Sequence, residues 1–319
     1  MKLHENEKDF SQAIQATASA LGIREVFVQK DYWVCYILKN LSLSEHKSQV
    51  VFKGGTSLSK AHKVIHRFSE DVDLAIISNG LTDNQIKPLM KKIETVVAIT
   101  PLKQLTGHAA VSKGSKHRKT VWEYNQVLGG DFGDATKDLI LEINSFTKPS
   151  PFNLVSIQTY IADFFQQNSL NDDLVSNELH PFQVNVLDLK RTITEKIAAI
   201  AGASSRQPDD HSELKNKIRH LYDLAMLLRI QEVVAFINSA EFLVMYETVK
   251  IEDRNIPGQR PNNDQHILET PIFKSTGVVL SELTDTYQNK FMSLVYKTES
   301  APQIKEIKAA LELVKKRFE

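Results

Sequence analysis

Apolar side chains recur every three to four residues in two N-terminal stretches, which predicts two helices that each bury one face. The first stretch covers 9–21 and stops at Gly22, and glycine is common just beyond the last turn of a helix. The second covers 26–42, and a further helical pattern covers 82–100. The first hundred residues are therefore predicted to contain three substantial helices.

Shorter runs, rich in β-branched or alternating side chains, predict strands. They are bounded by glycine, proline and polar residues and cover 48–55, 72–77, 119–127, 137–146 and 180–189. After about residue 149 helical periodicity prevails, over 187–202, 211–230, 231–250 and 301–319. The segment 251–271 is polar and holds several prolines and asparagines, which predicts a long loop.

These elements predict an α+β fold in which a small mixed β-sheet is followed by helices. The pattern divides the chain into two regions. Residues 1–148 hold the N-terminal helices and the sheet core, and residues 149–319 form a mainly helical C-terminal domain.

Charge and cysteine content narrow the classes of protein. Lys and Arg number 39 and so do Asp and Glu, so any surface that attracts nucleic acid must be local. The single cysteine, Cys35, excludes an internal disulfide framework and lies in an apolar run, so we expect a core residue in a reducing compartment. The N-terminus is charged and no apolar run approaches the ~20 residues of a membrane span. We expect a cytoplasmic protein.

The stretch VFKGGTSLSKAHKVIHRFSEDVDLAII, residues 51–77, carries the first chemical signal. Gly54 and Gly55 follow a predicted strand and precede a short predicted helix, 57–65, for which Thr56 or Ser57 is the expected N-cap. Glycines let a ligand approach the backbone, the first N–H groups of a helix attract anions, and the hydroxyls of Thr56 and Ser57 would add further donors. The stretch therefore predicts phosphate binding, although it lacks the spacing of a Walker loop.

Asp71 and Asp73 carry the second signal, because residues i and i+2 of a strand point to the same face. Two adjacent carboxylates repel each other unless they share a cation, and Mg²⁺ (or Mn²⁺) prefers such oxygen ligands. Glu142, in a later predicted strand, completes a three-carboxylate cluster if that strand is a neighbour. It would then bind metal or act as a general base. Each feature alone is explained by a turn, a strand end or an edge, but their order is unexpected by chance, and such a cluster can hold metal for in-line phosphoryl or nucleotidyl displacement.

A basic run precedes the aromatic residues Trp122 and Tyr124. Single-stranded RNA is bound by cations on phosphates and by rings on bases, so we expect either an RNA contact or a solvated basic loop here. The residues concerned are Lys113, Lys116, Arg118 and Lys119.

The chain resembles the AbiEii/AbiGii nucleotidyltransferase toxins, which belong to the DNA polymerase β-like superfamily. Four stretches carry the resemblance: FVQKDYWV (27–34, with Gln29 where the family usually has Glu), FKGGTSLSKAHKVIHRFSEDVDLAI (52–76), TITEKIAAI (192–200) and KIRHLYDLAMLL (217–228). The resemblance runs from about residue 10 to the C-terminal helix, and 251–275 has no counterpart in it. It implies that the sheet region is a nucleotidyltransferase core.

The resemblance also implies a function in abortive infection and phage defence. Such toxins transfer nucleotides from an NTP, with Mg²⁺, to an RNA acceptor such as the tRNA 3′ end, and a cognate antitoxin restrains them. By resemblance Lys196 contacts the triphosphate, although a lysine at the edge of the core is the simpler explanation. Asp223 has Lys196, Arg219 or His220 as its expected partner, and it either takes part in catalysis or orients Lys196 through an ion pair. Arg67 either binds the nucleotide or pairs with Asp31 or another acid.

Two alternatives to an RNA-modifying toxin stay open. In the first, the same enzyme modifies a hydroxyl on a protein or a small molecule. In the second, the chain is a non-catalytic relative that retains the fold to bind a partner.

Overall fold

The computed structural model describes residues 1–69, 71–133, 135–254, 256 and 265–319. The chain forms two compact units. The sheet unit consists of Met1–Lys63 and Phe68–Leu187, and the helical unit consists of Val64–Arg67 and Asp188–Glu319. Each unit is described by itself below.

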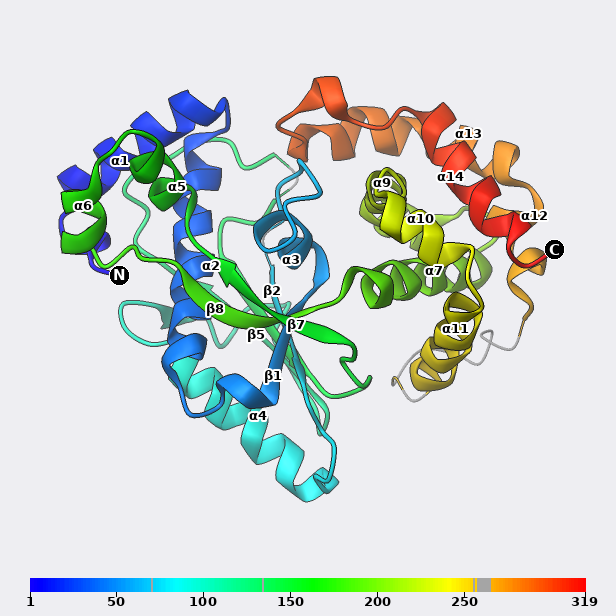
Figure 1. Ribbon diagram of the computed structural model, residues 1–319, viewed down its shortest axis with the longest axis horizontal. Coiled ribbons are helices and arrows are strands. Elements are labelled where there is room, and N and C mark those ends of the chain that lie inside the picture. Colours follow the sequence, from blue (N-terminus) through cyan, green and yellow to red (C-terminus); the bar gives the residue numbers. More distant parts are fainter. Residues whose placement is uncertain (70, 134, 255, 257–264) are drawn as a thin grey trace. The chain divides into compact units, whose positions relative to one another are not determined.

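Within the described residues the sheet unit holds eight strands in one mixed sheet (Figure 1). They are β1 (Val50–Lys53), β2 (Asp71–Ile76), β3 (Lys103–Gln104), β4 (Ser112–Lys113), β5 (His117–Glu123), β6 (Leu139–Asn144), β7 (Phe152–Ile157) and β8 (Phe182–Leu187). Their order is β3-β5-β6-β2-β1-β8-β7, with β4 paired to β5. The pairs β2–β6 and β1–β8 are parallel and the others are antiparallel. The predicted α+β fold with a mixed sheet is confirmed.

The sheet continues past residue 148, where we expected the first region to end. β8 pairs with β1, and β7 pairs with β8 along its full length. These ladders tie residues 152–187 to the sheet, so the compact units divide between Leu187 and Asp188. The β7 strand was not expected from the sequence.

One face of the sheet is apolar and packs on helices. The helices of this unit are α1 (Glu7–Leu21), α2 (Glu25–Leu43), α3 (Gly54–Lys60), α4 (Asp83–Val97), α5 (Tyr160–Gln167) and α6 (Asn171–Ser176). Figure 1 shows α2 and α4 beside the strands, and Phe52, Leu74 and Leu141 share one buried core with them. Cys35 is buried in α2 as expected, and burial raises the pKa of its thiol.

Two helix ends in this unit are set by residues that commonly cap helices. Gly22, at φ 65°, ends α1, and a capping box between Thr82 and Gln85 begins α4. The expectation for α3 was wrong, because this helix begins at Gly54, so Thr56 and Ser57 lie inside it and neither is the N-cap.

The helical unit contains α7 (Leu189–Arg206), α8 (Ser212–Asn216), α9 (Ile218–Leu227), α10 (Gln231–Ile237), α11 (Ala240–Asp253), α12 (Pro271–Lys274), α13 (Thr276–Asp285) and α14 (Ile304–Lys316). Two predicted helices are each divided in the structure. The 211–230 stretch breaks at Lys217, and the 231–250 stretch breaks at Asn238 and Ser239. Much of the predicted loop 251–271 lies outside the described residues, but its first three residues extend α11.

A buried ion pair fixes α3 against α2. Asp31 of α2 and Lys60 of α3 lie 2.6 Å apart (Oδ1 to Nζ), and each is about 5% exposed or less. The second oxygen of Asp31 accepts a hydrogen bond from the backbone N–H of Tyr160, at the start of α5. The Lys60 ammonium also lies 4.0 Å from the centre of the Tyr160 ring. One carboxylate therefore joins three helices.

Breaking this ion pair should destabilise the fold strongly. Asp31→Asn leaves the buried Lys60 ammonium without its counter-charge, and we expect a loss of about 3–5 kcal/mol in the free energy of unfolding. The double variant Asp31→Leu/Lys60→Met removes both charges and should recover most of that loss. Urea unfolding of the wild type, Asp31→Leu, Lys60→Met and the double variant measures the coupling. Additive single losses would contradict the pairing.

Candidate active site

Four charged residues form a row across the face of the sheet opposite to the apolar core. Strand register pairs Lys119 of β5 with Glu142 of β6, Glu142 with Asp73 of β2, and Asp73 with Lys53 of β1. Directly paired residues point to the same face, so the row reads positive, negative, negative, positive. The predicted neighbourhood of β2 and β6 is thus observed, and it brings Glu142 beside Asp73.

Asp73 is the most perturbed carboxyl group of this row. Loss of hydration, followed by repulsion from Glu142 and then from Asp71, raises the pKa of Asp73 to about 8. Lys53 and Lys119 act in the opposite direction. The carboxylates therefore lie close enough to oppose each other's ionisation, which is the property expected of a cation site or of a proton-transfer site.

Gly54 is required by its contact with Asp73. A Cβ atom at Gly54 would lie 2.0 Å from Oδ2 of Asp73, and the backbone there has φ +80°. A side chain is therefore excluded by space as well as by conformation. The first glycine of the pair allows the α3 turn to approach the carboxylate.

The two hydroxyls of the predicted phosphate site are buried. Thr56 Oγ1 lies 2.6 Å from the carbonyl oxygen of Asp71, to which it donates, and 3.1 Å from Ser69 Oγ. Ser57 Oγ donates to the carbonyl of Gly54 at 2.8 Å. Both hydroxyls therefore stabilise the turn itself, and a phosphate here would depend mainly on backbone N–H groups.

The donor chemistry of this face suits a hard cation. Asp71, Asp73 and Glu142 offer carboxylate oxygens, which Mg²⁺ prefers. Within the described parts of the chain, no three His, Cys, Asp or Glu side chains converge closely enough to enclose a metal. Mg²⁺ usually binds one or two carboxylates together with water and substrate phosphates. The residues fit a metal site of that kind, in which water and substrate phosphates would supply the remaining ligands.

Glu142 has two basic neighbours on β5. Lys119 Nζ lies 3.7 Å from Oε2 of Glu142, and His117 Nδ1 lies 3.9 Å from Oε1. From the sequence, His117 was expected only as a member of the basic run and not as a neighbour of Glu142. Its position two residues before Lys119 on a strand was the available signal, because such residues share a face.

Arg118, the residue between them, points to the other face. It is buried, and its Nε donates to Glu94 of α4 at 2.6 Å. Of the basic run, Lys113 is exposed, while Lys116 and Lys119 are partly exposed. Lys116 also lies 3.0 Å from Asp83. Because Arg118 is buried against Glu94, an RNA-contacting role of the predicted run depends on its three lysines, which are exposed or partly exposed.

The helical unit contains a second cluster of predicted residues. Arg67 donates to both oxygens of Asp223, at 2.7 Å each, and Lys196 Nζ donates to Oδ2 at 2.6 Å. Asp223 is buried, yet the two cations hold its pKa below the usual range. Arg67 therefore pairs with an acid, which was one of the two roles expected for it. The acid is Asp223 and not Asp31, because Asp31 is paired with Lys60.

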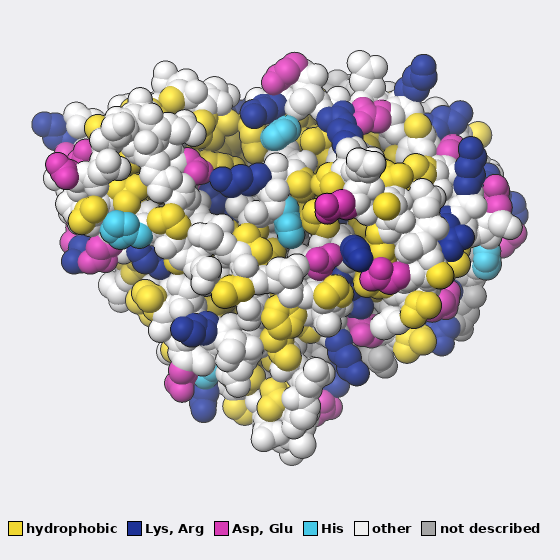
Figure 2. Space-filling view, in the orientation of Figure 1, with side chains coloured by type: hydrophobic (Ala, Val, Ile, Leu, Met, Phe, Trp, Pro, Cys, Tyr) yellow, Lys and Arg dark blue, Asp and Glu magenta, His cyan; other side chains and the backbone are white. Residues whose placement is uncertain are grey.

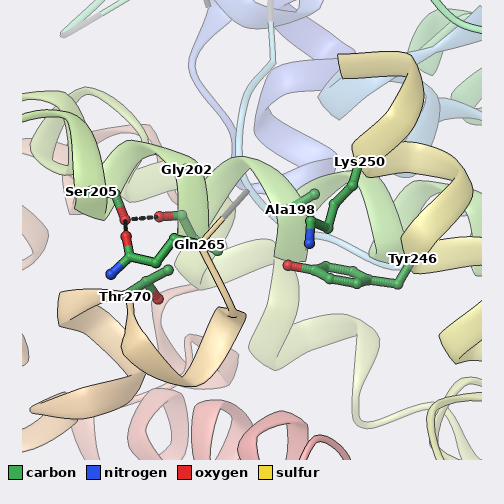
Figure 3. A pocket seen from close by; sticks show the side chains of 8 residues that line it. Ala198, Gly202, Ser205, Tyr246, Lys250, Gln265 and Thr270 are labelled. Atoms are coloured by element: carbon green, nitrogen blue, oxygen red, sulfur yellow. Dashed lines mark hydrogen bonds between the residues drawn. The ribbon is translucent and has the colours of Figure 1, made fainter. Parts of the chain in front are cut away.

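A small cavity also lies in the helical unit, between α7, α11 and the residues before α12 (Figure 3). Its volume is about 10 Å³, which is room for about one water molecule. Ser205 donates to Gln265 across it, and Tyr246 and Lys250 line the other end. The cavity is too small for a nucleotide.

Comparison with known proteins gives one family. A family model described as "Nucleotidyl transferase AbiEii toxin, Type IV TA system" matches residues 36–312. No curated protein matches the chain. Among solved structures the chain is similar to MenT4, a nucleotidyltransferase toxin from Mycobacterium tuberculosis H37Rv, with 15% identity and a TM-score of 0.45 over 91% of this chain and 92% of that one. In the described residues no helix is long and apolar enough to cross a membrane.

The raised pKa of Asp73 predicts a distinctive pH dependence of stability. The folded state holds a proton up to about pH 8, whereas an unfolded aspartate releases it near 3.9. This contribution to stability is therefore complete below pH ~4 and is lost as the pH rises through 8. Removing the carboxylate in Asp73→Asn should therefore stabilise the metal-free protein more at pH 8.5 than at pH 5, by on the order of 4 kcal/mol, because about 3 pH units of unmatched titration lie between these limits.

Urea unfolding in EDTA from pH 5 to 8.5 measures this difference. Asp209→Asn, at an exposed aspartate of the helical unit, is the matched control and should change neither the stability nor its pH dependence. Parallel pH profiles for wild type and Asp73→Asn would show that Asp73 ionises without penalty.

Proposed function

The chain belongs to the AbiEii nucleotidyltransferase toxin family of type IV toxin–antitoxin systems, and from this premise we propose that it transfers a nucleotide from an NTP to an RNA acceptor, the 3′ end of tRNA. The proposed reaction uses Mg²⁺ bound through Asp71 and Asp73, with Glu142 as the third carboxylate of the cluster. Membership in a nucleotidyltransferase family makes the chain an enzyme of this class. Membership in a toxin–antitoxin family implies an antitoxin as partner.

The pairing of Asp73 with Glu142 is the observation that carries the proposal. Two carboxylates in register on neighbouring strands repel each other, and loss of hydration together with this repulsion raises the pKa of Asp73 to about 8. A divalent cation bound by the two carboxylates would attract both of them and so offset their repulsion. It would also offset the negative charge of the triphosphate. The unfavourable arrangement in the protein alone supports a site that is completed by metal and nucleotide.

The proposed chemistry is an in-line displacement at the α-phosphorus of the NTP. The oxygen of the acceptor hydroxyl bonds to phosphorus while the bond to the bridging oxygen of the β-phosphate breaks, and pyrophosphate leaves. We assign removal of the hydroxyl proton to Glu142, with Asp71 and Asp73 as the metal ligands. Backbone N–H groups at Gly54 and Gly55 would contact the β- and γ-phosphates, and Lys196 would contact the triphosphate.

RNA binding is proposed for the lysines of the β4–β5 hairpin. Lys113 lies on β4, Lys116 in the turn and Lys119 on β5 next to Glu142. The chain has no net charge, and Figure 2 shows acidic and basic side chains interspersed over the visible face. A short, local group of lysines is therefore the kind of RNA contact that this protein can offer.

Labelling with each NTP in turn tests the proposed reaction. Incubation with α-³²P-labelled NTP, Mg²⁺ and total tRNA should label the RNA, and EDTA should prevent it. Asp71→Ala should reduce the rate by at least about 10²-fold, because a metal ligand on the reacting face is lost. Asp209→Ala, at an exposed position, should label like the wild type. Periodate oxidation of the tRNA 3′ end should abolish the label if the 3′ hydroxyl is the acceptor.

The alternatives give different results in the same assay. Label on protein or on a small molecule, with none on RNA, would replace the RNA acceptor by another hydroxyl. No label with any NTP, together with growth inhibition that survives Asp71→Ala, would favour a non-catalytic relative.

Neutralising the hairpin lysines should weaken RNA binding by an electrostatic route. Lys113→Gln, Lys116→Gln and Lys119→Gln should each reduce the slope of log K against log salt by about one unit or less. Binding of tRNA at several salt concentrations, in EDTA to prevent reaction, measures the slope. Lys305→Gln in the helical unit serves as the charge-matched control. An unchanged slope in the triple variant would rule the hairpin out as the RNA contact.

A further inference from the structure

Lys196 is held by two acceptors from one face of α9. Its Nζ lies 2.6 Å from Oδ2 of Asp223 and 3.2 Å from Nδ1 of His220. Residues 220 and 223 are three apart in a helix, so they lie on the same face, and α7, which carries Lys196, packs against that helix. The family resemblance singled out the lysine and the aspartate but assigned nothing to the histidine.

The contact defines the chemical state of His220. An ammonium group has three donors and no acceptor, so Nδ1 of His220 must offer its lone pair and the ring proton must be on Nε2. Burial and then the charges of Lys196, Lys217 and Arg67 lower the pKa of His220 well below its ordinary value, with Asp223 opposing. The imidazole is therefore neutral at physiological pH.

We propose that His220 is a positioning residue that orients the Lys196 ammonium through its neutral Nδ1. This inference rests on the triphosphate role proposed above for Lys196. Asp223 shares its two oxygens between Arg67 and Lys196. The histidine therefore restrains the Lys196 ammonium from a second direction. Because the histidine is neutral, it adds that direction without adding a negative charge beside a lysine that has to attract phosphate.

Asparagine and aspartate are matched probes of this role. Their Oδ1 atom follows Cγ as Nδ1 does in histidine, and the two side chains differ by one charge. His220→Asn retains a neutral acceptor and should keep kcat/KM for the NTP within about threefold of wild type. His220→Ala loses the acceptor, and we expect kcat/KM to fall at least about tenfold. His220→Asp should raise KM for the NTP by about tenfold or more while raising Tm, because it adds a carboxylate beside cations.

A purely structural histidine would give another pattern. Tm would fall in His220→Ala and His220→Asn alike, with kinetic constants per folded molecule unchanged in all three variants, and this would overturn the proposal. His180→Ala, at an exposed histidine of the sheet unit, controls for loss of an imidazole and should match the wild type.

The contact itself can be tested without any reaction. Long-range ¹H–¹⁵N spectra of histidine-labelled protein at pH 7 should show His220, identified by its loss in His220→Asn, as the Nε2–H tautomer. Lys196→Met should shift its Nδ1 resonance. A protonated ring, or a resonance indifferent to Lys196→Met, would overturn the proposal even if the wild type transfers nucleotides. The expected spectra with no NTP transfer by wild type would instead refute the proposed function and leave the contact established.

Discussion

The repulsion between Asp73 and Glu142 is the constraint around which the sheet unit is arranged. Parallel pairing of β2 with β6 holds the two carboxylates in register, and the residues around them reduce the cost of their repulsion. Lys53 and Lys119 flank the pair on the outer strands, and the residue that meets Asp73 from α3 is a glycine. The opposite face of the same strands is apolar and packs on α2 and α4. The core thus supplies the stability that holds the charged face together.

Buried ion pairs serve a different purpose in each unit. In the sheet unit, Asp31 accepts from Lys60 and from the first turn of α5, which fixes α3, the helix that begins with the glycine pair. In the helical unit, Asp223 receives two cations, and His220 completes the hold on one of them. Such pairs gain little net stability because the charges lose hydration. Their value here lies in direction, since each restricts a side chain or a turn to one geometry.

Two kinds of contact, strand pairing and the packing of helix faces, explain why the candidate site residues come from distant parts of the sequence. The carboxylates need strand register, because only neighbouring strands bring side chains of one face within reach of each other. The position of Lys196 depends on one face of α9, because its described acceptors, His220 and Asp223, are three residues apart on that helix. The two clusters therefore depend on different secondary structure, the carboxylates on strand register and the lysine on a helix face.

Local chemistry was readable from the sequence. The alternation of a strand places Asp71 and Asp73 on one face, Gly22 ends α1, and the order of glycines, hydroxyls and acids indicated the family. Interactions over longer distances were not readable, because periodicity reports only which face a residue is on. The tertiary structure decided that Glu142 lies against Asp73, that Arg67 pairs with Asp223 while Asp31 pairs with Lys60, and that Arg118 faces α4. It also decided that α3 begins at Gly54, since only the approach of Asp73 shows why that residue has no side chain.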